Sequence, residues 1–459
     1  MITYRTKPFF FLFVFLLSGT GCSLTALPAS RPLPTVVPSA VRMLTLDDLR
    51  TQAALPVSLT NSGAVGLSLD AEVLSMVNEI SRQNLMAYVR QLESFGTRNT
   101  FSPVDQPGFG IGAAREWIFT EMTRVGGGRL QVSYQDYPLT FEGLSNTQRN
   151  IIGVLPGVGG HPGVLVMVAN YDTRAEDWLD GETLSPGADD NASGVAALLE
   201  VARVMSAYQW QQTVIFVATT AEEQGTYGAR NFVQTALSNG MRIDAAINND
   251  MVGGRAGIPQ FARLYAPGPD DSPSRQLGRY IHLIGSIYLP EFPVIVIDAL
   301  DREGRWGDHR EFVRAGVAGV RLIESEEDLE IQNSPLDTWT LVDYDYLRRM
   351  AQLNLAALAN MAAAPGQPDA PAVSPGDAPG SYRLVWDIDP TAAGYAIVFR
   401  PLNNMTYEDA VFHYVNGADS GNLVVSELNP AVTYAVSLAA LDARGRISVF
   451  SPEIITGPR

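Results

Sequence analysis

The stretch Gly187-Ala188-Asp189-Asp190-Asn191-Ala192-Ser193-Gly194 places two adjacent carboxylates directly before a long apolar segment. Residues 192–205 carry apolar side chains at helical spacing, so a helix is predicted there, with the acidic pair before its first turn. The positive end of a helix stabilises nearby carboxylates, and acidic pairs in this position are often ordinary helix caps. The chemistry of the pair therefore depends on which other side chains lie close to it.

Polar residues also follow three apolar runs that are predicted to be strands. They are Asn170 and Asp172 after 164–169, Glu222 and Glu223 after 213–219, and Asp250 after 243–247. Because the carboxyl ends of parallel strands lie along one edge of a sheet, these residues are expected to meet in one crevice. Clustered carboxylates suit a metal site with one spare carboxylate that carries protons.

The order of apolar runs predicts an α/β fold followed by an all-β sandwich. From residue 150 to 361, strand-like and helix-like segments alternate, which indicates a mostly parallel mixed sheet flanked by helices. Beyond residue 381 the segments are strand-like and separated by turn residues at short spacing, which is typical of a sandwich.

Composition divides the chain into five segments. They are a lipoprotein-like signal peptide at 1–22, a flexible tether at 23–68, the α/β domain at 69–363, a Pro-rich linker at 364–380 and the β domain at 381–459. Arg5 and Lys7 precede a short apolar run, and small residues lead to Cys22, the only cysteine. This pattern predicts export of a bacterial type, either as a cell-surface lipoprotein with a lipid on Cys22 or as a secreted protein.

Charge restricts the partners. The net charge of −17 over 459 residues disfavours binding to nucleic acid or to an anionic membrane surface. Any membrane attachment is therefore expected to depend on a lipid at Cys22. The hydrophobic fraction of 46% is sufficient for a large buried core.

Residues 72–363 resemble the co-catalytic zinc aminopeptidases of metallopeptidase family M-28, which also has carboxypeptidase-like and glutaminyl-cyclase-like branches. The matching stretches are Phe95-Gly96-Thr97-Arg98, Arg149-Asn150-Ile151-Ile152-Gly153, Asn170-Tyr171-Asp172-Thr173, 187–194, 219–228, Asn248-Asn249-Asp250-Met251 and Gly307-Asp308-His309. The resemblance implies the zinc exopeptidase fold for this part of the chain.

The resemblance also implies a role for each acidic residue. Asp190 would bridge two zinc ions, Glu223 would bind one of them and Asp250 the other. Glu222 would be the general base. Asp172 would orient the ligand at position 170.

Two positions depart from the family. Asn170 and Gln332 stand where the resemblance implies zinc-binding histidines. An amide oxygen is neutral and suits zinc less well than imidazole, and an all-oxygen shell leans towards calcium, magnesium or manganese. The cofactor expected by resemblance is one or two zinc ions, with another divalent ion or none as the alternatives.

Three functions remain open at this point. The first is an exported exopeptidase of the aminopeptidase type, which acts on peptide or protein N-termini through a metal-activated water and Glu222. The second is a catalytically impaired binding or scaffold protein on the peptidase fold, as the loss of both imidazoles suggests. The third is a glutaminyl-cyclase-like enzyme.

The C-terminal segment resembles a fibronectin type III domain. Trp386 lies on its first predicted strand, and Tyr434 follows the segment Leu428-Asn429-Pro430-Ala431-Val432-Thr433, as the corner tyrosine of that family would. The resemblance implies a module that binds a surface or a protein partner.

Overall fold

The computed structural model describes residues 64–417 and 421–457. The predicted signal peptide, Cys22 and residues 23–63 of the predicted tether lie outside these residues. Within the described part of the chain, no helix is both long and apolar enough to cross a membrane.

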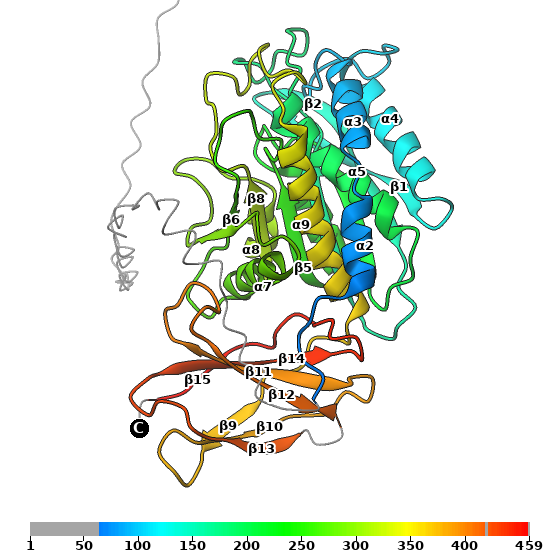
Figure 1. Cartoon of the computed structure of the whole chain (residues 1–459). Coiled ribbons are helices and arrows are strands. Elements are labelled where there is room, and N and C mark those ends of the chain that lie inside the picture. Colours follow the sequence, from blue (N-terminus) through cyan, green and yellow to red (C-terminus); the bar gives the residue numbers. More distant parts are fainter. Residues whose placement is uncertain (1–63, 418–420, 458–459) are drawn as a thin grey trace, which may run out of the picture. The chain divides into compact units, whose positions relative to one another are not determined.

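The α/β domain is built on an eight-stranded mixed sheet (Figure 1). In spatial order its strands are β1 (Gln131–Phe141), β2 (Leu144–Leu155), β4 (Thr213–Thr219), β3 (Gly163–Asn170), β5 (Arg242–Asn249), β8 (Gly319–Ile323), β6 (Ala262–Tyr265) and β7 (Val294–Ile297). The central strands β4, β3, β5 and β8 are parallel to one another, whereas the β1–β2 hairpin and the β6–β8 pair are antiparallel. This arrangement confirms the predicted fold class.

Helices cover both faces of the sheet. One face packs against α2 (Ala71–Glu79), α3 (Arg82–Glu93), α4 (Gly110–Val125), α5 (Gly194–Met205), α7 (Pro273–Tyr288) and α9 (Tyr344–Ala363). The other face packs against α6 (Tyr227–Ser238) and α8 (His309–Arg314). Alternate residues of β3 enter the two cores, Leu165 and Met167 on one side and Val166 and Val168 on the other. Burial on both faces explains why this strand is an unbroken apolar run.

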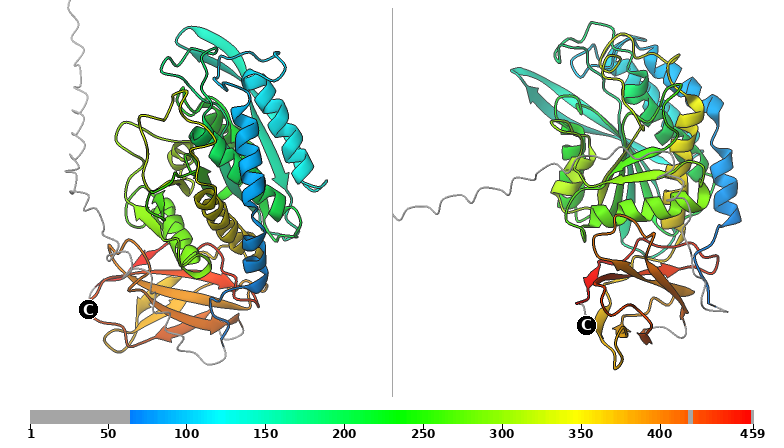
Figure 2. Two further views of the ribbon diagram at one scale, coloured as in Figure 1. Left: turned by 45° about the horizontal axis from the view of Figure 1, so that its top comes forward. Right: turned by 60° about the vertical axis from the view of Figure 1, so that its left-hand side comes forward.

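Several elements have weak sequence patterns and were not predicted. Strand β1 lies at the edge of the sheet, and most of its side chains are at least partly exposed. It pairs with β2 through a tight turn at Glu142-Gly143, both with positive φ, and Figure 2 shows this hairpin extending beyond the rest of the sheet. Helix α4 begins in a glycine-rich stretch that hides its apolar periodicity.

The C-terminal part forms two antiparallel sheets that enclose one core. The strands are β9 (Ala372–Pro375), β10 (Tyr382–Val385) and β13 (Asn422–Val425) in one sheet, and β11 (Gly394–Pro401), β12 (Val411–Asn416), β14 (Tyr434–Leu441) and β15 (Ile454–Ile455) in the other. Strand β9 pairs with β10 and lies inside the predicted linker, so the β structure begins before residue 381. Trp386 and Tyr434 are buried in this core, and the likeness to a fibronectin domain stays a prediction.

Candidate active site

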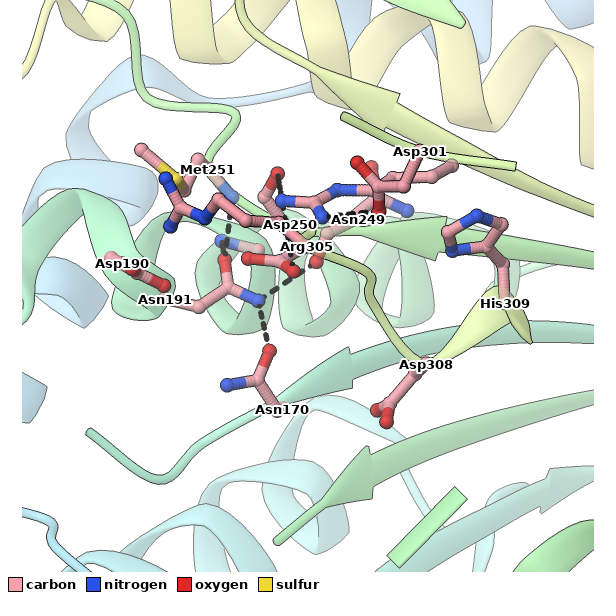
Figure 3. A network of polar contacts seen from close by, with 12 residues as sticks. Asn170, Asp190, Asn191, Asn249, Asp250, Met251, Asp301, Arg305, Asp308 and His309 are labelled. Atoms are coloured by element: carbon pink, nitrogen blue, oxygen red, sulfur yellow. Dashed lines mark hydrogen bonds and ion pairs between the residues drawn. The ribbon is translucent and has the colours of Figure 1, made fainter. Parts of the chain in front are cut away.

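Five of the seven predicted site residues line one cavity of about 870 Å³ at the carboxyl ends of the central strands. They are Asp190, Glu222, Glu223, Asp250 and Gln332. The other two are buried and do not line the cavity. Asn170 is the last residue of β3 (Figure 3), and Asp172 is two residues further on. The topology therefore brings the acidic segments together as parallel strands require.

The Asp189-Asp190 pair is not a helix cap. It belongs to an irregular turn, η1 (Ala188–Ser193), in which Asp190 and Asn191 have non-helical φ and ψ angles. The regular helix α5 starts at Gly194 without a side-chain cap. The Asp337 carboxylate accepts the backbone N–H groups of Asp189 and Asp190 at 2.8 and 2.9 Å. The side chain of Asp189 in turn accepts the N–H of Gly253 at 2.7 Å. These bonds fix the backbone so that the Asp190 side chain lines the cavity.

A buried arginine ties the loops of the site together. The Arg98 guanidinium donates to the carbonyl oxygens of Leu92 (3.1 Å), Tyr171 (2.8 Å), Pro186 (2.6 Å) and Gly187 (2.8 Å). Burial lowers the pKa of Arg98 to about 10, so it stays charged at neutral pH. One side chain thereby joins the end of α3 and the loop after β3 to the loop that carries Asp190.

A second buried arginine neutralises the carboxylate after β5. Arg321 Nη2 lies 3.0 Å from Asp250 Oδ2, and its Nη1 lies 2.7 Å from Asp301 Oδ2. The Arg321 side chain is only 1% exposed, so the surrounding core holds it in place. Burial raises the pKa of Asp250 to about 6, and the attraction of Arg321 opposes this shift.

The remaining predicted ligands also have internal partners. Glu223 Oε2 lies 2.9 Å from Nε of Arg174, whose side chain is 22% exposed. Gln332 donates from Nε2 to Asp190 Oδ2 at 2.6 Å, so its N–H group rather than its oxygen faces that carboxylate.

The amide of Asn170 faces a neighbouring amide. Its Oδ1 accepts a hydrogen bond from Asn191 Nδ2 at 2.7 Å, and Asn191 also donates to the carbonyl oxygen of Asn249 at 2.9 Å (Figure 3). This hydrogen bond occupies one of the two acceptor sites of the Asn170 amide oxygen.

Glu222 differs from its neighbours because its carboxylate has no hydrogen bond or ion pair within the described residues. It lines the cavity, and burial together with the negative charges of Asp250 and Glu223 raises its pKa well above the ordinary value. Asp172 lies behind it and accepts the backbone N–H of Glu223 at 3.1 Å. Burial raises the pKa of Asp172 to about 7.

Three site residues adjoin a left-handed backbone. Ala221 (φ 54°) precedes Glu222, Met251 (φ 58°) follows Asp250, and Asn333 (φ 57°) follows Gln332. Residues other than glycine rarely adopt this backbone conformation, and those that do are concentrated at functional sites. The backbone here is shaped to present particular side chains to the cavity.

The residues present do not fit a pair of metal ions. Between Asn170, Asp190 and Asp250, one amide oxygen already accepts a hydrogen bond and a fixed guanidinium already balances Asp250. A divalent cation placed there would be repelled by Arg321 at short range. Among residues 64–417 and 421–457, no group of three His, Cys, Asp or Glu side chains is arranged to hold a metal.

The other half of the site fits a single ion better. Asp190 and Glu223 offer carboxylate oxygens, and the Gln332 amide offers an oxygen if it turns over. The competing cation, Arg174, is partly exposed and stacks on Trp178 with its guanidinium 4.9 Å from the ring centre. Arg174 can therefore move away from Glu223 and remain solvated when an ion takes its place. Arg321 cannot move away from Asp250 in this way, because its charge would stay buried.

A protein-family model and curated relatives match this chain. The family model for peptidase family M28 matches residues 150–358. A probable zinc metalloprotease of Leptosphaeria maculans is 32% identical over 378 residues, which cover 74% of this chain and 88% of that protein. The chain belongs to peptidase family M28. By sequence and by fold it is a metallopeptidase of that family.

Solved structures agree on the fold. The LapA aminopeptidase of Legionella pneumophila matches with a TM-score of 0.53 at 18% identity, over 66% of this chain and 78% of that chain. A glutaminyl cyclase of Bacteroides thetaiotaomicron matches with a TM-score of 0.50 at 21% identity, over 61% and 98%. At these identities the likeness shows a shared fold alone and does not separate hydrolysis from cyclisation.

Sequence reasoning missed the arginines of the site. A signal for Arg321 was present, because it interrupts the buried apolar run Gly319-Val320-Arg321-Leu322-Ile323 and a charged residue inside such a strand needs a buried partner. Arg174 had no comparable signal, since its position in a loop is typical of a solvated side chain.

Replacement of Arg98 by methionine should lower the free energy of unfolding by at least about 3 kcal/mol, because several buried carbonyl groups lose their donor. Urea unfolding followed by circular dichroism measures this change. The control is Arg383→Met, an exposed arginine whose loss should cost less than about 0.5 kcal/mol. Equal losses of stability in the two variants would contradict the role of Arg98 in joining the loops of the site.

The purified chain should bind no more than one divalent ion, and Gln332→His should raise its zinc affinity about tenfold or more because imidazole replaces an amide. Asn170→His should not raise the number of bound ions above one, since Arg321 still neutralises Asp250. Titration calorimetry and elemental analysis after dialysis give affinity and stoichiometry. Two ions per unmodified chain, or none even in Gln332→His, would refute this assignment.

Proposed function

We propose that this protein is an exopeptidase that hydrolyses peptides near their N-terminus, with Glu222 as the general base. The observation that supports this most directly is the position of Glu222. Among the predicted site residues it alone has a carboxylate without a hydrogen bond or ion pair to the described residues, and it lines the same cavity as Glu223 and Asp250. A general base needs a carboxylate that can reach the attacking water.

We refer to four acidic residues that line the cavity as its acidic floor: Asp190, Glu222, Glu223 and Asp250. The floor attracts the cationic α-amino group of a free N-terminus, which places the first peptide bond near Glu222. Glu222 takes a proton from the attacking water and returns it to the leaving amine. Arg321 keeps Asp250 ionised and in position throughout.

One divalent ion would be held by Asp190, Glu223 and Gln332. When bound, it would supply Lewis-acid polarisation of the scissile carbonyl. The relatives' description as zinc metalloproteases supports zinc for that position, whereas the oxygen donors suit a harder ion equally well.

A second candidate function is peptide binding without hydrolysis. It is favoured by the internal partners of the predicted ligands, because Arg174, Arg321, Asn191 and Gln332 satisfy them without any metal. A protein of this kind would still hold a peptide N-terminus on the acidic floor but would release it unchanged.

Glu222→Gln should reduce kcat on aminoacyl-p-nitroanilides by about 10²–10⁴-fold, the usual contribution of a general base, while substrate binding persists. Absorbance of released nitroaniline measures the rate. Glu291→Gln, which removes an exposed carboxylate elsewhere, should leave kcat unchanged.

Full activity in Glu222→Gln would remove this residue as the base. A complete absence of turnover in the unmodified chain, with and without added zinc or manganese, combined with measurable peptide binding, would favour the second candidate.

We propose in addition that the protein is exported and anchored through Cys22. Support comes from Arg5 and Lys7, the apolar run after them and the position of the single cysteine. In a bacterial host the full chain should incorporate labelled palmitate and fractionate with membranes, and Cys22→Ala should abolish the label. Unlabelled unmodified chain would rule out the lipid anchor.

A further inference from the structure

Arginines surround the cavity above the acidic floor. Six of its lining residues are arginines: Arg174, Arg230, Arg302, Arg305, Arg310 and Arg321. The chain as a whole has 49 acidic against 32 basic residues, so this concentration of positive charge is local. Arg174 and Arg321 form ion pairs with carboxylates of the floor. We refer to the other four, Arg230, Arg302, Arg305 and Arg310, as the basic rim.

Around Glu311, arginines outnumber the carboxylate that pairs with them. Glu311 lies 3.0 Å from Arg310, 3.2 Å from Arg314 and 3.4 Å from Arg230. A single carboxylate balances only one of these three charges, so the cluster keeps an excess of positive charge. Arg230 and Arg310 line the cavity, whereas Arg314 does not.

A second group of arginines, around Glu327, shows the same imbalance. Glu327 pairs with Arg263 at 2.9 Å and closely with Arg302, while Arg305 lies 3.7 Å away. Arg302 has a second partner in Asp301, but Arg305 has no other acidic partner within the described residues. The side chain of Arg305 is 32% exposed, and Figure 3 draws it with the floor residues Asp190 and Asp250.

Aromatic rings hold two of the rim arginines in place. The Arg310 guanidinium lies 4.8 Å from the ring centre of Trp306, and that of Arg230 lies 4.9 Å from Tyr227. Nε and Nη2 of both arginines already donate, to Glu311 and to the carbonyl oxygen of Gly225. Within the described residues, Nη1 is therefore the group left to reach a carboxylate in the cavity, where its charge strengthens the hydrogen bond.

We propose that the cavity selects peptides that carry acidic side chains next to a free N-terminus. The acidic floor takes the α-amino group and repels carboxylates, so acidic side chains are directed to the basic rim. This inference rests on the proposed function only in that the cavity is the peptide-binding site, and it does not require hydrolysis.

The test compares two pentapeptides that differ only at their second and third residues, which are both glutamate in one and both glutamine in the other. Affinities are measured by calorimetry in the full chain carrying Glu222→Gln, so that neither peptide is consumed. The glutamate peptide should bind about tenfold or more tightly, as charge-assisted pairing with arginine predicts.

Rim variants locate the source of this preference. Arg230→Gln combined with Arg305→Gln should bring the affinity ratio close to one, and both side chains are exposed enough to be replaced without unfolding the chain. The matched control is Arg314→Gln, which removes a partner of the same Glu311 from outside the cavity and should preserve the ratio.

Equal affinities for the two peptides would overturn the proposal, as would an equal loss of preference in Arg314→Gln. Hydrolysis is scored separately in the unmodified chain. A preference for the glutamate peptide without cleavage of either would refute the hydrolase and leave acid selection intact. Cleavage of both peptides at equal kcat/KM, with equal affinities, would refute acid selection and leave the hydrolase intact.

Discussion

Buried negative charge is the constraint on which the rest of this site depends. The topology of the sheet brings Asp190, Glu222, Glu223 and Asp250 to one edge. Burial and repulsion by neighbouring carboxylates raise the pKa values of Glu222, Glu223 and Asp250 there. In a two-metal site the ions would offset that cost. Here the offset comes from the protein itself, through Arg321 on Asp250, Arg174 on Glu223 and the Gln332 amide on Asp190.

The two arginines are not equivalent, and the difference sets the character of the site. Arg321 is enclosed by the core and shared with Asp301, so its charge is a permanent part of the fold. Arg174 reaches solvent and rests on Trp178, so its contact with Glu223 can open at small cost. The family's metal chemistry is therefore excluded from one half of the site and still compatible with the other.

The cavity has an acidic part and a basic part, and both follow from how charged side chains are paired. The floor is acidic because strand ends converge there, and the rim is basic because arginines from α6, α8 and the loop before α8 share too few carboxylates. A molecule that carries a positive end and negative side chains matches both zones. A protein with a strongly negative overall charge can bind such a molecule only through a local arrangement of this kind.

The sequence by itself determined the architecture and the acidic half of the site. Strand β4 and the apolar runs of β3 and β5 were predictable because strands buried on both faces must be continuously apolar, and the residues after them then had to share one edge. Helix α4 and strand β1 escaped prediction because a glycine-rich start and an exposed edge weaken the periodic signal.

Only the tertiary structure decided which groups neutralise those carboxylates. Asn191 with Asn170, Arg321 with Asp250 and Arg230 with Glu311 are pairs of residues that are far apart in the chain and belong to different strands, helices or loops. A loop arginine looks the same in sequence whether it faces water or a buried carboxylate. The role of such an arginine depends on its distance from a carboxylate and on its burial, and both are set only when the sheet and its loops have folded.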